Sequence, residues 1–245
     1  MKTRNTPRAS GRRALLLVIT RAPIPGFAKT RLGETIGMEQ AALLHRAFLT
    51  DIAHKFFAPG TLSDTIERGW AITPATYDFA ALTRSLAPSV PVEKMVFVNQ
   101  VGEGLGARLT NCFAWAAEHG HQDTVIMASD SPQLDPAIIL QAFSELDLHD
   151  LVIGRVHDGG YYLVGQRGFS DVLSQVPMST SNAAEALVET ATARGLSVAE
   201  LPHDLDVDVE QDLCLLYNRL LPDGRDARAT FEAIQDLLIE QSCEP

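Results

Sequence analysis

Short apolar runs alternate with longer amphipathic stretches along the chain, and this alternation constrains the fold more than any other feature. Several of the runs are continuous in Val, Ile and Leu, which is typical of strands covered on both faces of a sheet. Strands that alternate with helices predict βαβ units, right-handed crossovers and a mainly parallel sheet. We find no internal repeat, low-complexity tract or Pro/Ser-rich linker, so we expect one domain over residues 14–245.

The expected strands are Ala14–Thr20, Gly69–Thr73, Lys94–Asn99, Thr124–Ala128, Leu151–Val156, Tyr161–Val164 and Leu196–Leu201. The expected helices are Met38–Phe57, Leu105–Glu118, Pro136–Leu146, Asn182–Arg194, Glu210–Leu220 and Ala227–Glu240. In folds of this class, ligands bind beyond the carboxyl ends of the strands. We therefore look for functional residues where each strand runs into its loop.

Charge excludes several classes of partner. The chain has 20 Lys and Arg against 31 Asp and Glu, a net charge of -11, which argues against non-specific binding of nucleic acid or of an anionic membrane. The first thirteen residues are basic and precede the apolar run 14–19, which resembles a signal peptide but lacks a cleavage site before Arg21. We expect a disordered basic tail over residues 1–13 and then a buried strand. The three distant cysteines favour a reducing cytoplasm.

The first strand runs into a stiff loop that contains two prolines and Gly26. Lys29 and Arg31 follow, next to backbone N–H groups that a helix start leaves free. Fixed donors, a lysine point charge and a forked guanidinium are the groups that grip a phosphate chain. The spacing is not that of a Walker A loop. The alternative is an ordinary proline turn followed by solvated basic residues.

Three glycines, Gly102, Gly104 and Gly106, follow the third strand and open a helix that carries Leu105 and Arg108. Glycines let a ligand approach the backbone, and a helix N-terminus favours negative charge. The spacing does not match the dinucleotide fingerprint. A binding loop and a tight turn from strand to helix both explain this segment.

The fourth strand ends abruptly in Ser129 and Asp130. A carboxylate at the end of a central strand is costly to bury without a cation. Mg²⁺ that bridges Asp130 to a diphosphate would supply one, because Mg²⁺ often uses only one or two protein carboxylates and phosphate oxygens. The alternative is a helix cap, but Asp135 followed by Pro136 already has the form of that cap.

Two further strand ends carry acids. Asp158, Gly159 and Gly160 lead into two tyrosines, which predicts either a hairpin turn or a site for a small acceptor or sugar. Asp206 and Asp208 lie after the last strand and just before a helix, so they are either capping and solvated acids or a second contribution to a metal centre. The histidines show no spacing typical of a zinc site.

The order of these motifs along residues 15–216 is itself informative. They are Ala22-Pro23-Ile24-Pro25-Gly26 with Lys29-Thr30-Arg31-Leu32, Leu105-Gly106 with Arg108, Ser129-Asp130-Ser131-Pro132, Asp158-Gly159-Gly160-Tyr161-Tyr162-Leu163, Ser179-Thr180, and Asp206-Val207-Asp208 before Asp212-Leu213. In this order the chain resembles a bacterial family of nucleotide-diphospho-sugar transferases, also named radical-SAM/selenodomain-associated glycosyltransferases. It is more distantly similar to 2-phospholactate guanylyltransferases and to the molybdenum-cofactor guanylyltransferase.

The resemblance implies a GT-A-like (Rossmann-like) fold, a three-layer αβα sandwich with a mixed, mainly parallel sheet. The chain also departs from the family. Residues 102–108 lack the two acids usual at their positions in that loop, Met178 stands in place of a tryptophan, and residues 60–77 differ most. These departures concern the acceptor and the activity more than the nucleotide.

We therefore expect a transferase that uses Mg²⁺ or Mn²⁺, binds a nucleotide-diphospho-sugar and transfers the glycosyl group to a small acceptor. The alternatives are a nucleotidylyltransferase, which joins an NTP to a phosphorylated small molecule and releases pyrophosphate, and a nucleotide-binding module without turnover. The expected residues are Asp158 and Asp130 for catalysis; Ala22, Pro23, Gly26, Lys29, Arg31, Gly104, Leu105, Arg108 and Ser129 for the nucleotide; Gly159, Gly160, Tyr161, Ser179 and Thr180 for the acceptor; and Asp130, Asp206 and Asp208 for the metal.

Overall fold

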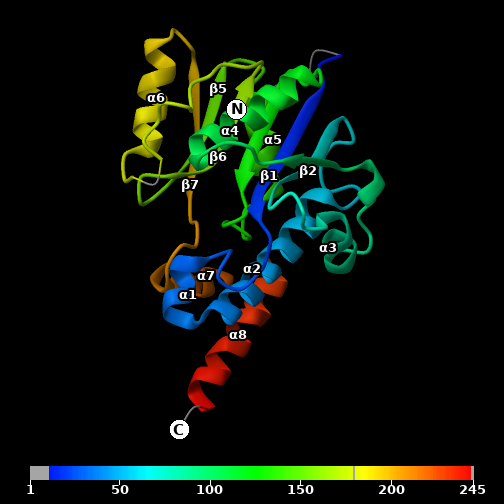
Figure 1. Cartoon of the computed structure of the whole chain (residues 1–245), viewed down its shortest axis with the longest axis vertical. Helices are drawn as coiled ribbons and strands as arrows, with labels where there is room; N and C mark the ends of the chain where they lie inside the picture. The colour runs from blue at the N-terminus through cyan, green and yellow to red at the C-terminus, as the bar shows by residue number, and fades with distance from the viewer. Residues whose placement is uncertain (1–10, 179, 244–245) are drawn as a thin grey trace, which may run out of the picture.

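A mixed sheet forms the centre of the molecule, for which a computed structural model describes residues 11–178 and 180–243 (Figure 1). Within these residues the strands are β1 (Ala14–Arg21), β2 (Ile66–Thr73), β3 (Val96–Asn99), β4 (Asp123–Ala128), β5 (Leu151–Val156), β6 (Tyr161–Arg167) and β7 (Val198–Asp204). Their spatial order is β3-β2-β1-β4-β6-β5-β7. β6 is antiparallel to both β4 and β5, while the other neighbours are parallel.

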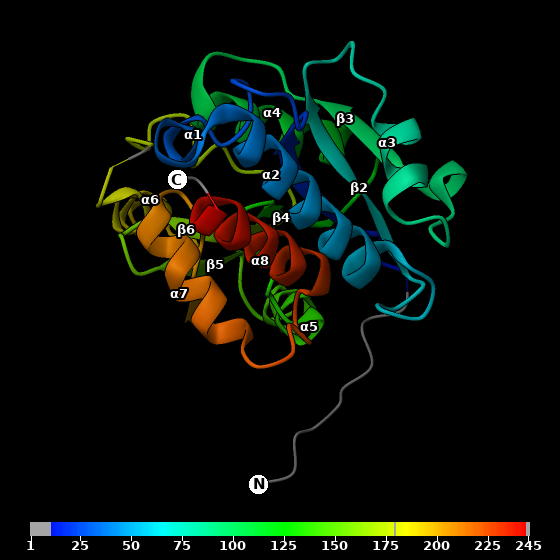
Figure 2. The same cartoon turned by 90° about the horizontal axis from the view of Figure 1, so that it is seen from below.

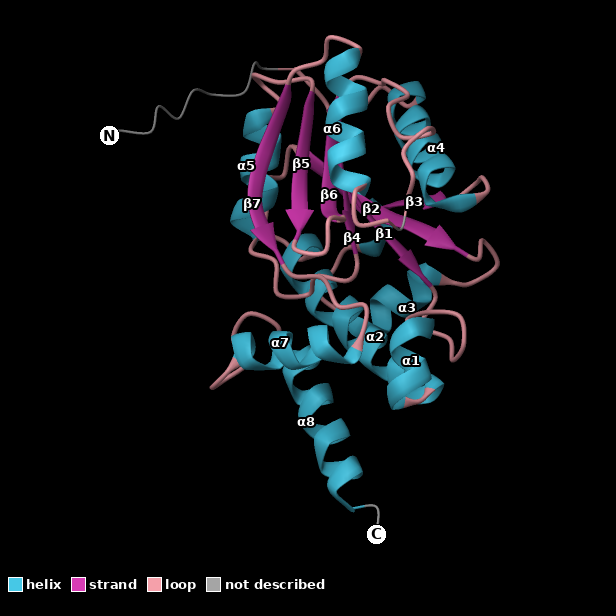
Figure 3. Cartoon of the chain, turned by 90° about the vertical axis from the view of Figure 1, so that its left-hand side faces the viewer, coloured by secondary structure: helices cyan, strands magenta, loops and turns pink. Residues whose placement is uncertain are grey.

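The helices are α1 (Thr30–Ile36), α2 (Met38–Ile52), α3 (Phe79–Leu86), α4 (Gly104–Glu118), α5 (Pro136–Glu145), α6 (Ala183–Ala193), α7 (Glu210–Leu220) and α8 (Arg228–Cys243), with a π-helical turn at Ala53–Phe57 and a 3-10 turn at Val92–Lys94. α4 and α6 cover one face of the sheet, whereas α3, α5 and the end of α2 cover the other. Figure 3 shows α5 and α6 on opposite sides of β5 and β7.

β1 shows why a continuous apolar run suits this position. Leu15 and Leu17 pack into the core under α4, and Leu16 and Val18 pack into the core on the opposite face. Successive side chains of a strand point to opposite faces, so a strand with helices on both sides needs apolar residues at every position. The expected α/β sandwich with a mixed, mainly parallel sheet is confirmed.

A further group of helices, α1, α2, α7 and α8, lies beyond the carboxyl ends of the strands. These helices share a core that includes Phe48, Leu216 and Phe231. In Figure 3 the arrows of β5 and β7 point toward this group, and Figure 2 shows α2, α7 and α8 side by side from below. The carboxyl ends of the parallel strands therefore lie next to this group of helices.

The structure describes only the last part of the expected N-terminal tail, residues 11–13. Residues 1–10 of the expected tail lie outside the described residues. Arg12 and Arg13, which we placed in that tail, form ion pairs with Asp123 and Glu67 and so are held against the body. α1 and α3 were not expected, because each is a short helix of seven or eight residues. No helix of the described residues is long and apolar enough to cross a membrane.

Candidate functional site

A cavity of about 510 Å³ opens at the carboxyl ends of β1 and β4 and is bordered by α1, α4 and β6. It draws residues from several of the strand-to-loop segments singled out in the sequence. Nine of the predicted site residues line it, namely Lys29, Arg31, Gly104, Leu105, Arg108, Ser129, Asp130, Tyr161 and Asp208. The fold thus brings together side chains that are far apart in the sequence.

The loop between β1 and α1 forms one wall of the cavity. The Ala22 amide donates to Thr73 O at 2.8 Å, and the Phe27 amide donates to Ile24 O at 3.0 Å. Lys29 follows with φ 51°, a left-handed conformation that a non-glycine residue adopts only where its surroundings hold it. Ala22, Pro23 and Gly26 belong to this loop but do not line the cavity.

The Lys29 side chain is 5% exposed and occupies a fixed position. Its Nζ lies 2.6 Å from Oδ1 of Asp130, donates to Val207 O, and sits 5.4 Å from the centre of the Phe48 ring. Burial opposes ionisation of Asp130, but the Lys29 ammonium together with other nearby charges, Arg21 among them, holds the pKa of this carboxyl below its ordinary value. The predicted phosphate cation and the predicted metal ligand are therefore partners in this structure.

Arg31 and Asp208 form a second pair across the cavity. Nη1 of Arg31 lies 2.9 Å from Oδ2 of Asp208, and the two side chains are 68% and 38% exposed. Arg108, also on the cavity wall, instead donates from Nε to the backbone oxygen of Gly102 at 3.2 Å. The segment before α4 is therefore a tight turn, and its Gly104 also borders the cavity.

Asp206 lies within a group of acids. Burial raises its pKa to about 7, and the charges of Asp208, Asp158 and Asp130 act in the same direction. Burial also raises the pKa of Asp208. Asp206 and Asp158 do not line the cavity, but Asp206 feels the charges of the cavity residues Asp130 and Asp208 as well as that of Asp158. Negative charge therefore accumulates here beyond what Lys29 and Arg31 balance.

The donor chemistry of this group fits Mg²⁺ or Mn²⁺, because hard divalent cations prefer carboxylate oxygens. The Asp130 carboxylate already forms an ion pair with the Lys29 ammonium. Among residues 11–178 and 180–243, no three His, Cys, Asp or Glu side chains form a group that could hold a metal ion. The three expected ligands are thus not a preformed set, and a metal would be held by Asp130 and Asp208 together with ligand oxygens.

The segment after β5 is the hairpin turn that the sequence allowed. The Val156 amide donates to Gly160 O at 3.1 Å, and the Gly160 amide donates to Oδ1 of Asp158 at 2.9 Å. Gly159 has φ 92°, and a Cβ there would lie 1.7 Å from Ser181 O. The expected acceptor segments are therefore packed together.

Of the expected acceptor residues, Tyr161 lines the cavity, whereas Gly159, Gly160 and Thr180 do not. Thr180 donates from its hydroxyl to Pro177 O at 2.8 Å. Ser179 lies outside the described residues.

Among the cavity residues that were not expected are Arg21, Gln100 and His45. Arg21 ends β1 and Gln100 follows β3, where Nε2 of Gln100 donates to Thr20 O at 2.7 Å and to Ala71 O at 2.8 Å. Both occupy strand ends, so the rule that we applied to other strands would have found them. His45 is a buried residue of α2 whose pKa burial lowers to about 4, so it is neutral. Nothing in its helical pattern marks it.

Comparison with known proteins shows which family and which solved structures this chain resembles. Residues 71–180 match the model of the family DUF2064, described as "Uncharacterized protein conserved in bacteria". No curated protein matches the sequence. The structure is similar to a "putative nucleotide-diphospho-sugar transferase" from Desulfovibrio desulfuricans G20, with a TM-score of 0.81 and 28% identity over 94% of this chain and 98% of that one.

Two other solved structures share the fold at lower identity. A cytidylyltransferase from Leptospira borgpetersenii has a TM-score of 0.50 and 11% identity over 95% of this chain and 96% of that one. A 4-diphosphocytidyl-2C-methyl-D-erythritol synthase from Anaerococcus prevotii has a TM-score of 0.52 and 11% identity over 85% and 98%. The chain thus resembles the DUF2064 family over residues 71–180 and the Desulfovibrio protein over nearly its whole length, which is the family resemblance that its motifs predicted.

Proposed function

We propose that this protein is a metal-dependent transferase that binds a nucleotide-diphospho-sugar in the cavity and transfers its glycosyl group to a small acceptor. The observation that carries the proposal is the cavity itself, where Arg31, Arg108, Asp130 and Asp208 converge from four segments. Cations that bind phosphate beside carboxylates that bind a metal are the two halves of a diphosphate site. The likeness to the Desulfovibrio protein supports the same class.

In this proposal, Arg31 and Arg108 bind phosphate oxygens, and the loop of Ala22, Pro23 and Gly26 shapes the wall beside Ser129, Gly104 and Leu105. Lys29 holds Asp130 in place through its 2.6 Å contact. A divalent cation held by Asp130 and Asp208, with Asp206 beside them, would supply Lewis-acid stabilisation of the leaving diphosphate. Preorganised charges that face the developing negative charge give the main catalytic contribution.

Asp158 is proposed to orient, or accept the proton of, an acceptor hydroxyl. It is exposed at the hairpin turn, and its charge contributes to the raised pKa of Asp206. An acceptor would then enter between this turn, Tyr161 and Thr180. Asp158→Asn is expected to leave nucleotide binding intact and to lower transfer by about 10²- to 10⁴-fold.

Nucleotidyl transfer is the second candidate. Arg21, which the sequence reading did not include, also lines the cavity, so three arginines border it. Three cations suit a triphosphate at least as well as a sugar nucleotide. In that reaction a phosphorylated acceptor attacks the α-phosphate of an NTP, and pyrophosphate leaves.

A thermal-shift panel separates these functions. Stabilisation by UDP- or GDP-sugars with Mg²⁺ supports glycosyl transfer, and stabilisation by NTPs with Mg²⁺ together with pyrophosphate release supports nucleotidyl transfer. Binding without turnover of either kind supports the binding module. Absence of a response to every nucleotide, with and without metal, would overturn both enzyme functions.

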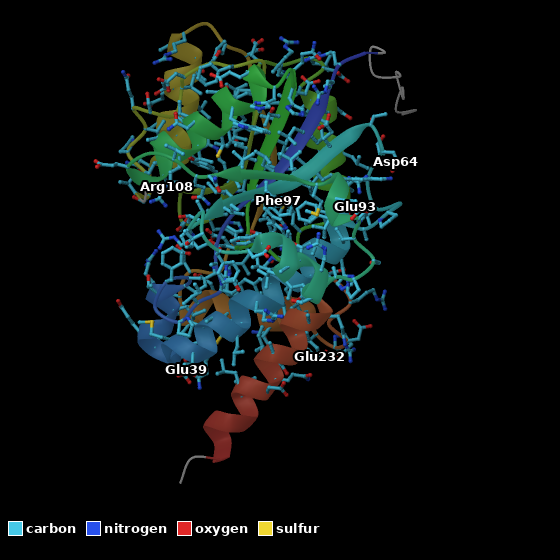
Figure 4. The ribbon with its side chains drawn as sticks, turned by 45° about the vertical axis from the view of Figure 1, so that its right-hand side comes forward. Glu39, Asp64, Glu93, Phe97, Arg108 and Glu232 are labelled. Atoms are coloured by element: carbon cyan, nitrogen blue, oxygen red, sulfur yellow. The ribbon has the colours of Figure 1, made fainter. Side chains whose placement is uncertain are left out.

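The metal assignment is tested with Asp130→Asn. We expect this variant to lose the Mg²⁺-dependent part of nucleotide binding. Asp64→Asn is the matched control, because Asp64 is 97% exposed and lies far from Arg108 of the cavity wall (Figure 4). Unchanged Mg²⁺ dependence in Asp130→Asn would contradict the assignment.

A further inference from the structure

Two of the three cations predicted from the sequence for the nucleotide, Lys29 and Arg31, are each paired with an acid predicted for the metal. Lys29 contacts Asp130 at 2.6 Å, and Arg31 contacts Asp208 at 2.9 Å. Without a ligand, each of these two acids thus has a side-chain cation as its partner. A phosphate group and a metal ion would each have to compete with a side chain that already holds the binding partner.

The two pairs differ in their freedom to exchange. The Lys29 side chain is 5% exposed, contacts Val207 O as well as Asp130, and begins α1 in a left-handed backbone conformation. Arg31 is 68% exposed and reaches Asp208 through one Nη1–Oδ2 contact. Exposed ion pairs of this kind are weak and are easily replaced. We therefore expect Lys29 to remain bound to Asp130, whereas Arg31 can exchange Asp208 for another partner.

We infer that Arg31 and Asp208 are exchange partners. When a metal-diphosphate ligand enters, Arg31 leaves Asp208 for a phosphate oxygen, and Asp208 turns its carboxylate to the metal, while Lys29 remains on Asp130. The inference rests on the proposed function, since it needs a ligand that carries both phosphate and metal. A ligand with only one of the two must break the pair and leave one member without a partner.

The exchange predicts positive coupling between the two halves of the ligand. Metal that binds alone competes with Arg31 for Asp208, and phosphate that binds alone competes with Asp208 for Arg31. When both arrive together, each released side chain gains a new partner, so each half strengthens the binding of the other. Removal of Arg31 should therefore favour metal alone while it weakens phosphate.

Calorimetric titration with MnCl₂ alone tests this directly. Arg31→Gln is expected to bind Mn²⁺ about two- to five-fold more tightly than the wild type, the range that an exposed ion pair accounts for. In the presence of Mg²⁺, the same variant is expected to bind inorganic pyrophosphate about ten-fold more weakly. Opposite changes for the two probes are the signature of exchange.

Arg108→Gln is the matched control, because it removes a cation from the same cavity wall without releasing a carboxylate. Its Mn²⁺ affinity should stay within about two-fold of wild type. An unchanged Mn²⁺ affinity in Arg31→Gln, an equal gain in Arg108→Gln, or absence of Mn²⁺ binding in all three proteins would overturn the exchange. If wild-type protein binds neither pyrophosphate nor nucleotides with Mg²⁺, the proposed function fails, whatever Mn²⁺ does.

Discussion

Nζ of Lys29 lies 2.6 Å from Oδ1 of Asp130, and this contact joins the start of α1 to the segment that follows β4. Lys29 also donates to Val207 O, and the Val207 amide donates to the Asp130 backbone oxygen at 3.0 Å. Three segments that are distant in the sequence thus meet at one buried ammonium group. Both residues line the cavity, and their contact fixes the carboxylate that the proposed metal would use.

Lys29→Met should therefore destabilise the fold and not merely weaken a ligand. Asp130 would keep its charge without a cation, and a broken, partly buried pair costs about 2–4 kcal/mol. Arg31→Gln, which breaks the exposed pair, should cost less than about 1 kcal/mol. Urea unfolding of both variants measures the difference. Equal losses would show that Lys29 is not the anchor of this site.

The sequence predicted the positions of the strands but not how the charges pair. Every expected strand overlaps a strand of the sheet, because a strand buried on both faces leaves a continuous apolar run such as that of β1. Lys29 and Asp130 were singled out separately, each for its place at a strand end. Nothing in the local pattern of either residue states that the two side chains meet, since that depends on how β1 and β4 lie side by side.

The acceptor segments show a second limit of sequence reasoning. Asp158 and Gly159 were consistent with both a hairpin and a binding site, and the hairpin is confirmed. Whether Thr180 lies beside that turn depends on the close approach of Gly159 to Ser181. In the sequence, a close approach between two backbones is marked only by a glycine. Because a glycine also marks a turn, the sequence alone does not distinguish the two.

Gly159→Ala should disrupt this approach. Its φ of 92° is strained for any residue with a Cβ, and the added Cβ would lie 1.7 Å from Ser181 O. Gly168→Ala is the matched control, because Gly168 has φ 71° and no atom within 4 Å of the added Cβ. We expect a loss of about 1 kcal/mol at Gly168 and at least about 3 kcal/mol at Gly159. Similar melting temperatures for the two variants would contradict the clash.

Asp51→Ala should loosen α8. Asp51 is buried on α2, and its two carboxylate oxygens accept from the Ala229 amide at 3.0 Å and the Thr230 amide at 2.7 Å. Loss of both bonds leaves one buried and one partly buried N–H group unsatisfied, which costs about 2–3 kcal/mol. Hydrogen exchange should rise in the first turn of α8.

Asp135→Ala is the comparison for Asp51→Ala, since Asp135 caps α5 with a single exposed bond to Ala137 N. It should cost about 1 kcal/mol and leave exchange in α8 unchanged. Unchanged protection of the Ala229 and Thr230 amides in Asp51→Ala would show that the cap does not hold the helix.

Asp150 should make stability depend on pH in the acid range. The backbone amide and hydroxyl of Ser197 donate to its carboxylate at 3.0 Å and 2.7 Å, and Arg167 adds an ion pair at 2.5 Å. These bonds hold the pKa of Asp150 below its ordinary value. Because the folded-state pKa is depressed, the stabilisation is present above the unfolded pKa of about 4 and is lost as pH falls below it.

Asp150→Asn is therefore expected to be less stable than wild type by about 1 kcal/mol at pH 7, a modest value because the carboxylate is about a third exposed. The difference should shrink steadily as pH falls below about 4, since the unfolded chain then binds a proton at Asp150 that the folded state does not bind. Asp64→Asn, with its carboxylate 97% exposed, should differ little from wild type at any pH. Urea unfolding from pH 7 to pH 3 measures both differences, and a constant gap between Asp150→Asn and wild type would remove Asp150 as the source of the pH dependence.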